Sequence, residues 1–144
     1  MSFVLIRQAL ETKLATLPNL PYVAYENTQY VPTTGTAFIR FTLVPNQNRA
    51  AAIGVNAPTN NFGLLFLDVF TPANTGSYSG DQIADDLINL FQAGTYLTVS
   101  DSDTTLQVRI RFSERAQTIF EPDWNQVPVQ VSWYTYVPNN NEIF

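Results

Sequence analysis

Alternating apolar and polar residues near the C-terminal end constrain this fold more than any other feature. Leu106, Val108, Ile110 and Phe112 alternate with polar residues, and the same two-residue period runs through 127–137. This period is typical of strands that bury one face. Residues 37–44 share the pattern and end at Pro45, whereas 62–71 is apolar on both faces except at Asp68. A strand that is buried on both faces has that composition, and a second subunit is one candidate for the partner that buries the second face.

Two further segments have the three-to-four-residue apolar spacing of amphipathic helices. Residues 2–17 end at Pro18, and a second helix follows Ser79, which forms a capping box with Gln82. The expected order is helix, three strands, helix, three strands. We therefore expect an α+β fold in two layers, with a mostly antiparallel sheet and both helices packed on one face.

The length of 144 residues predicts a single domain, assigned to residues 1–137, followed by a polar tail at 138–144. Residues 46–61 are rich in Asn, Ala and Gly and lack a sustained period. We interpret this segment as a long hairpin loop, which either orders against a partner or is a disordered tip.

Missing residue types exclude several kinds of chemistry. The chain has no histidine, no cysteine and a single lysine, Lys13, so disulfides, Cys-ligated zinc and a Ser-His-Asp triad are excluded. Its net charge of −5 gives no basic nucleic-acid footprint, and no apolar run reaches the roughly 18 residues of a membrane span. We expect no catalytic residue, no metal site, no cofactor and no membrane partner.

Two alternatives remain as hypotheses. Asp81, Asp85 and Asp86 lie on one expected helix, where they would hold a divalent metal in a small hydrolase, although a solvated helix face is the favoured interpretation. Trp133 and Tyr134, with Tyr136, would form the aromatic face of a monomeric binding module.

Three arginines on the polar faces of strands are candidates for a subunit interface: Arg40, Arg109 and Arg111. Arginine suits planar pairing with carboxylates, and two interpretations stay open. The partners are either acids such as Asp123 or Glu114 of a neighbouring subunit or acids of the same chain. The full set of candidate interface residues adds polar loop, strand and tail positions: Arg40, Asn46, Asn48, Arg49, Asn56, Phe66, Asp68, Phe70, Arg109, Arg111, Asp123, Ile143 and Phe144.

Five segments together resemble a known family. They are the opening helix at 6–18, the segment at 21–27, the strand at 38–41, the apolar strand at 63–70 and a helix that ends near Leu90 and Phe91. Over residues 2–137 the chain resembles the small tail-completion proteins, or tail terminators, of long-tailed bacteriophages.

The resemblance implies a virion protein of the tail or neck, assembled in the bacterial cytoplasm. Such a subunit would form a homohexameric ring, cap the major tail tube protein and meet the head–tail connector or a neck protein. Six copies would carry a formal charge of −30, so DNA would pass through the lumen without specific binding. A head–tail joining protein of similar fold is the alternative.

Overall fold

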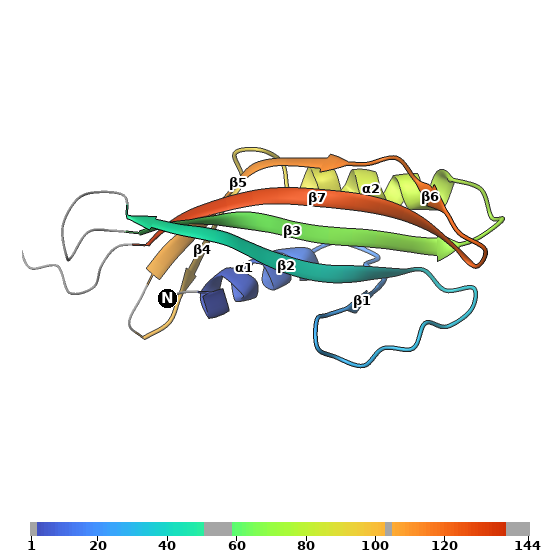
Figure 1. Cartoon of the computed structure of the whole chain (residues 1–144), viewed down its shortest axis with the longest axis horizontal. Helices are drawn as coiled ribbons and strands as arrows, with labels where there is room; N and C mark the ends of the chain where they lie inside the picture. Colours follow the sequence, from blue (N-terminus) through green and yellow to red (C-terminus); the bar gives the residue numbers. More distant parts are fainter. Residues whose placement is uncertain (1–2, 51–58, 103–104, 138–144) are drawn as a thin grey trace, which may run out of the picture.

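The computed structural model describes residues 3–50, 59–102 and 105–137, which form two helices and seven strands (Figure 1). The element order confirms the expected one, with one short strand added. The elements are α1 (Phe3–Ala15), β1 (Tyr22–Ala24), β2 (Phe38–Ala50), β3 (Thr59–Pro72), α2 (Tyr78–Leu90), β4 (Tyr96–Ser100), β5 (Thr105–Arg115), β6 (Ile119–Phe120) and β7 (Trp124–Val137).

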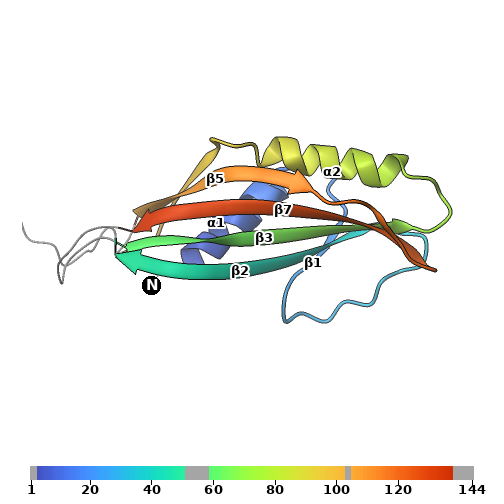
Figure 2. The same cartoon turned by 45° about the horizontal axis from the view of Figure 1, so that its top comes forward.

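The strands form one sheet in the order β1-β2-β3-β7-β5-β4, with β6 paired to β7. Every pair is antiparallel except β1 and β2. The sheet curls into a half-barrel, so that β4 lies well behind β2 and β3 in Figure 1 and the curvature is visible in Figure 2. The α+β class is therefore confirmed.

Both helices contribute to one hydrophobic core. Leu10 and Leu14 of α1 and Leu87 of α2 are fully buried, in the same cluster as Leu67 of β3 and Trp133 of β7. α1 packs against β4, and α2 packs against β7 and β3. The strands pass in front of both helices in the view of Figure 1.

The alternation predicted for 127–137 is confirmed at the apolar positions, whereas Ser132 of the predicted polar face is buried. Val127, Val129, Val131 and Trp133 are buried, whereas Tyr134 is exposed. This separates Trp133 from Tyr134, so the aromatic face expected from Trp133, Tyr134 and Tyr136 is wrong: Trp133 belongs to the core.

The start of α2 differs from the expected capping box. The helix begins at Tyr78, and its N-cap is Ser77, which makes no side-chain capping hydrogen bond. Ser79 therefore lies inside the first turn. The backbone N–H of Asp81 donates to the carbonyl oxygen of Ser77 at 3.0 Å, so the first turn begins two residues earlier than predicted.

The strand expected to end at Pro45 continues to Ala50, so the loop assigned to 46–61 is too long. Asn48 and Arg49 pair in register with Asn61 and Asn60 of β3. A register shift between Pro45 and Gln47 accommodates the proline, which an edge strand tolerates because its missing N–H faces away from the ladder. Farther along the chain, β5 continues to Arg115 and β7 begins at Trp124, with the short β6 between them.

Phe112 does not share the face of Leu106, Val108 and Ile110, contrary to the strict alternation predicted. The register between β5 and β7 shifts between Ile110 and Phe112, and Phe112 stands opposite Ser132. One extra residue in a strand moves the following side chains to the other face. Phe112 is consequently 39% exposed.

Within the part of the chain that the structure describes, no helix has the length and apolar character needed to cross a membrane.

Candidate interaction surface

One face of the sheet carries a group of apolar side chains that the core leaves uncovered. Val44, Phe112 and Tyr134 are each 39% exposed, and Leu64 and Phe66 are half-buried. The strand register brings them together, because Val44 pairs with Leu64 of β3 and Phe112 lies two strands farther along the same row. We call these five residues the outer patch.

The sequence indicated only part of the outer patch. Leu64 and Phe66 belong to the strand whose two faces are both apolar, and the residues that follow each of them, Leu65 and Leu67, are fully buried. Phe66 was a candidate interface residue. Phe112 was missed because its exposure depends on the β-bulge, which strict alternation does not reveal.

Arg40 and Asp68 form an ion pair across β2 and β3. Arg40 Nη2 lies 3.1 Å from Asp68 Oδ2, and the guanidinium carbon lies 5.1 Å from the ring centre of Phe70. Asp68 is largely covered, whereas 53% of the Arg40 side chain is exposed. Two of the candidate interface residues therefore satisfy each other's charge within one subunit, which is the intramolecular interpretation for Arg40.

Phe70 is also covered by its own chain. Its ring stacks on Phe38 with centroids 4.6 Å apart, and Phe38 meets Trp124 edge-on at 5.1 Å. Tyr30, from the segment between β1 and β2, lies 5.2 Å from Phe38. At this end of β3 the second cover of the apolar strand is therefore intramolecular.

The same β1–β2 connection borders a shallow groove of about 320 Å³ beside β2, lined among others by Tyr25, Glu26, Tyr30 and Arg40. Burial raises the pKa of the Tyr25 phenol, and the nearby charge of Glu11 raises it further. The phenol, which is neutral at pH 7 even without this shift, therefore stays protonated to a higher pH than an exposed tyrosine.

Arg109 and Arg111 are exposed on β5, next to the outer patch. Arg109 stands opposite Tyr134, and its Nη2 donates to Gln107 Oε1 at 3.1 Å. Among the described residues, neither Arg109 nor Arg111 forms an ion pair with a carboxylate. They therefore differ from Arg7, Arg40 and Arg115, each of which pairs with an acid of its own chain.

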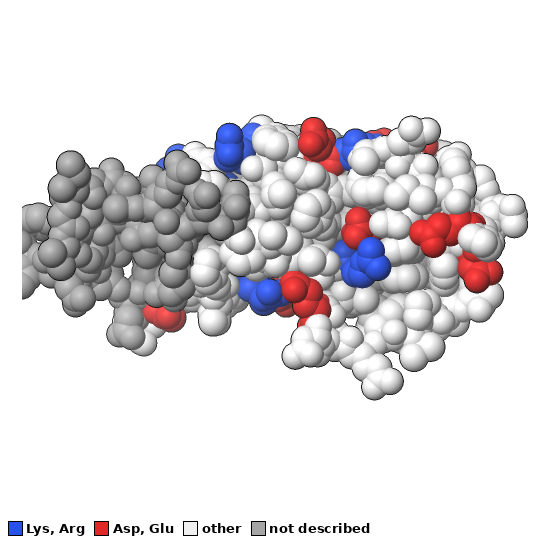
Figure 3. Space-filling view, in the orientation of Figure 1, with Lys and Arg blue, Asp and Glu red and all other residues white. Residues whose placement is uncertain are grey.

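Asp123 lies at the opposite end of the sheet, in the turn between β6 and β7. It is exposed and makes no ion pair with any residue that the structure describes. In Figure 3 acidic groups gather toward the right end of the molecule, a basic and an acidic group lie side by side near the middle of the face in view, and the surface to the left of that pair is largely uncharged. Ile119 and Phe120 of β6, 47% and 69% exposed, add apolar surface close to Asp123.

The three acids of α2 do not converge on a common point. Asp81 pairs with Arg115 of β5, and Asp86 accepts a hydrogen bond from Gln82 at 3.1 Å. Across residues 3–50, 59–102 and 105–137, no group of three or more potential ligands is placed to hold a metal ion. The protein contacts of Asp81 and Asp86 therefore account for these carboxylates without a metal ion.

The remaining candidate interface residues are placed only in part. Asn46, Asn48 and Arg49 belong to the far end of β2, where the backbone is described. Asn56, Ile143 and Phe144 lie outside the described residues.

The fold and this surface define a small α+β protein whose distinctive side chains are spread over one sheet face and its two ends. The family model of phage tail terminator proteins matches residues 5–133, and the chain belongs to that family. It is therefore a structural protein of the phage tail and a component of the virion, and its family suggests a role without catalysis.

A solved structure is similar over 100% of this chain and 98% of its own, with a TM-score of 0.68 and 26% sequence identity. The search among curated proteins found no match.

Proposed function

We propose that this protein terminates the phage tail by closing into a ring of six subunits on the end of the tail tube. The ring would cap the tube, present its other side to the head–tail connector or a neck protein, and let DNA pass through its lumen. The observation that supports this proposal most directly is the family match over residues 5–133. Assembly would take place in the host cytoplasm, and the virion would contain the ring between head and tail.

The two helices and the curled sheet would act as the two layers of the subunit. Buried side chains of both helices share one core with alternate strand residues, so the helices would cover one face and leave the other for partners. Residues 1–137 would form this unit, and the tail at 138–144 would serve assembly.

A ring of identical subunits needs a heterologous contact, in which two different surfaces of the same chain meet. Arg109 pairs in register with Tyr134 of β7. Asp123 immediately precedes Trp124, the first residue of that strand. The ten residue-to-residue steps from Trp124 to Tyr134 span about 33 Å at the rise of an extended strand. Arg109 and Asp123 are therefore too far apart to pair within one subunit, but they suit a head-to-tail contact between neighbours.

The outer patch would supply the apolar part of that contact. Tyr134 adjoins Arg109, and interface centres are enriched in tyrosine and arginine. Glu114, the other acid considered as a partner, lies on β5 itself beside the arginines. Asp123 at the far end of the sheet is therefore the better candidate for the neighbouring subunit.

The test is assembly on tail tubes, measured by sedimentation velocity and negative-stain imaging with and without tube protein. Arg109→Glu and Arg111→Glu each change the charge by the same amount as Lys13→Glu. Lys13 lies on α1 and makes no ion pair with a described residue, so Lys13→Glu is the matched control. We expect ring formation to fall at least tenfold for the β5 variants and to stay within twofold of the parent for the control.

The charge-swap experiment identifies the partner. Adding Asp123→Arg to Arg109→Glu should restore part of the lost assembly, because the two charges are exchanged across the contact. Equal assembly of all the single variants would contradict the assignment of Arg109 and Arg111 to the subunit interface. A protein that never forms rings, but binds a purified neck protein as a monomer, would favour the head–tail joining alternative.

A truncation tests the tail. A chain that ends at residue 137 should retain the folded signal by circular dichroism but fail to cap tubes. Normal capping by this truncation would remove Ile143 and Phe144 from the interface.

A further inference from the structure

The outer edge of β2 is covered along only part of its length. β1 pairs with β2 at Phe38, Ile39 and Arg40, but β2 continues to Ala50. Among the described residues, no other strand pairs with β2 on this side. An unpaired strand edge is a template for addition of another strand.

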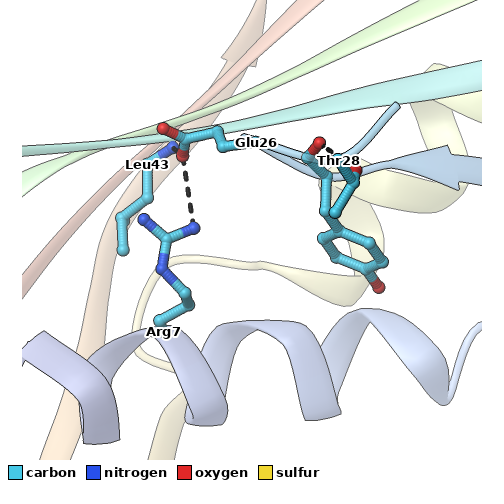
Figure 4. A network of polar contacts seen from close by, with 5 residues as sticks. Arg7, Glu26, Thr28 and Leu43 are labelled. Atoms are coloured by element: carbon cyan, nitrogen blue, oxygen red, sulfur yellow. Dashed lines mark hydrogen bonds and ion pairs between the residues drawn. The ribbon is translucent and has the colours of Figure 1, made fainter. Parts of the chain in front are cut away.

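The first part of this open edge is closed by side chains. The N–H of Leu43 donates to Glu26 Oε1 at 2.6 Å, and Arg7 Nη1 of α1 lies 3.2 Å from the same oxygen (Figure 4). Leu43 therefore directs its N–H away from β3. Pro45, two residues on, has the same direction but carries no N–H to donate. An incoming strand would find no free donor at Leu43 or Pro45.

The edge opens beyond the bulge. In an antiparallel pair, backbone groups point alternately toward and away from the neighbouring strand. Leu43 and Pro45, whose backbone groups point away from β3, pair with Leu65 and Gly63 of β3. The next β3 residues with the same orientation, two and four positions before Gly63, are Asn61 and Thr59. Their partners on β2 are Asn48 and Ala50. Asn48 and Ala50 thus direct their N–H and C=O groups to the free edge.

We propose that this open stretch of β2, Gln47–Ala50, accepts an edge strand from a second copy of the chain, so that the sheets of adjacent subunits join through main-chain hydrogen bonds. The inference rests on the proposed ring. Strand addition of this kind draws its affinity from backbone groups, so it does not depend on the side chains of this stretch, Gln-Asn-Arg-Ala.

A second copy of the chain is the favoured partner because the opposite edge of its sheet supplies a strand that could pair with β2. β4 (Tyr96–Ser100) is the opposite edge of the sheet, and β5 is its one strand partner in the described part of the chain. A head-to-tail ring joins two different surfaces of one chain, and the two edges of one sheet meet that requirement. Because Glu26 already accepts the N–H of Leu43, an added strand could pair only with the stretch after the bulge. That limit would fix the register of the added strand.

Proline substitution tests the pairing directly. Asn48→Pro removes an N–H that faces the free edge and breaks no hydrogen bond between β2 and β3, so the subunit should fold. Asn48→Ala is the matched control, because it changes the same side chain and keeps the N–H. We expect Asn48→Pro to weaken self-association at least tenfold and Asn48→Ala to leave it within twofold. Equal association of both variants and the parent would overturn the inference.

Hydrogen exchange on the parent protein gives a measurement that does not depend on a folded variant. The amides of Asn48 and Ala50 should exchange rapidly in the isolated subunit and become protected in the ring. Rings with these amides unprotected would overturn the edge pairing while the proposed function stands. Protection that appears with tube protein while the subunit remains monomeric would assign the edge to the tube, which overturns the second-copy proposal.

Discussion

Arg115, near the end of β5, donates from Nη1 to Asp81 Oδ1 in the first turn of α2, at 2.5 Å. The same guanidinium donates from Nη2 to Thr118 Oγ1 at 2.7 Å. A carboxylate near a helix N-terminus also interacts favourably with the helix dipole. Asp81 therefore contributes to the docking of α2 in two ways, which explains the acid without assigning it to chemistry.

Asp81→Asn should lower the free energy of unfolding by about 1 kcal/mol, since partly exposed ion pairs contribute about 0.2–1 kcal/mol and the dipole adds a similar amount. Urea denaturation measures the change. Asp85→Asn is the matched control, because Asp85 is exposed on the same helix and forms no ion pair with a described residue. Its effect should stay within about 0.5 kcal/mol. An equal loss in both variants would mean that helix charge alone, and not the contact with Arg115, accounts for the effect.

Gly80 allows α2 to lie close to the sheet. A Cβ at this position would stand 3.1 Å from Val127 Cγ2 and 3.5 Å from Thr71 Oγ1. Alanine gains about 1 kcal/mol of helix propensity over glycine, but overpacking costs about 1–3 kcal/mol and valine has little rotamer freedom to yield. Gly80→Ala should therefore destabilise by about 1 kcal/mol. Ser79→Ala, one residue earlier and exposed, should be close to neutral, and a stabilising Gly80→Ala would show that Val127 moves freely.

Much of the fold follows from residue patterns that act over short distances. The alternation around Val129 and Val131 predicted β7, and the spacing around Leu10 and Leu14 predicted α1. Both patterns reflect burial on one face, which local periodicity reports directly. The class and the element order were predictable for that reason.

The differences arise where a distant strand decides the local conformation. Pro45 does not end β2, because β3 continues to pair beyond it and the proline occupies an edge position. Phe112 is exposed because the bulge is defined by pairing with β7. The sequence predicted the exposed Arg109 and Arg111 of the candidate surface, but it did not predict that Arg40 finds Asp68, a pairing set by the register of two strands.

Magnesium binding tests the hydrolase alternative. The acids of α2 have protein partners at Asp81 and Asp86, so calorimetry with MgCl₂ or MnCl₂ should give no heat beyond dilution. Asp85→Asn should behave as the parent does. A saturable heat in the parent that disappears in Asp85→Asn would contradict the structural role and reopen the metal-dependent interpretation.

Trp133 is fully buried on β7, and its Nε1–H has no hydrogen-bond partner among the described residues. Burying an unsatisfied donor costs about 1–3 kcal/mol, which offsets part of what the large ring contributes by packing. Trp133→Phe removes the donor and keeps a ring, so it should cost about 1 kcal/mol, whereas Trp133→Ala should cost the 3–5 kcal/mol typical of a large cavity. Urea denaturation of both variants measures the difference. A Trp133→Phe cost as large as that of Trp133→Ala would contradict this expectation.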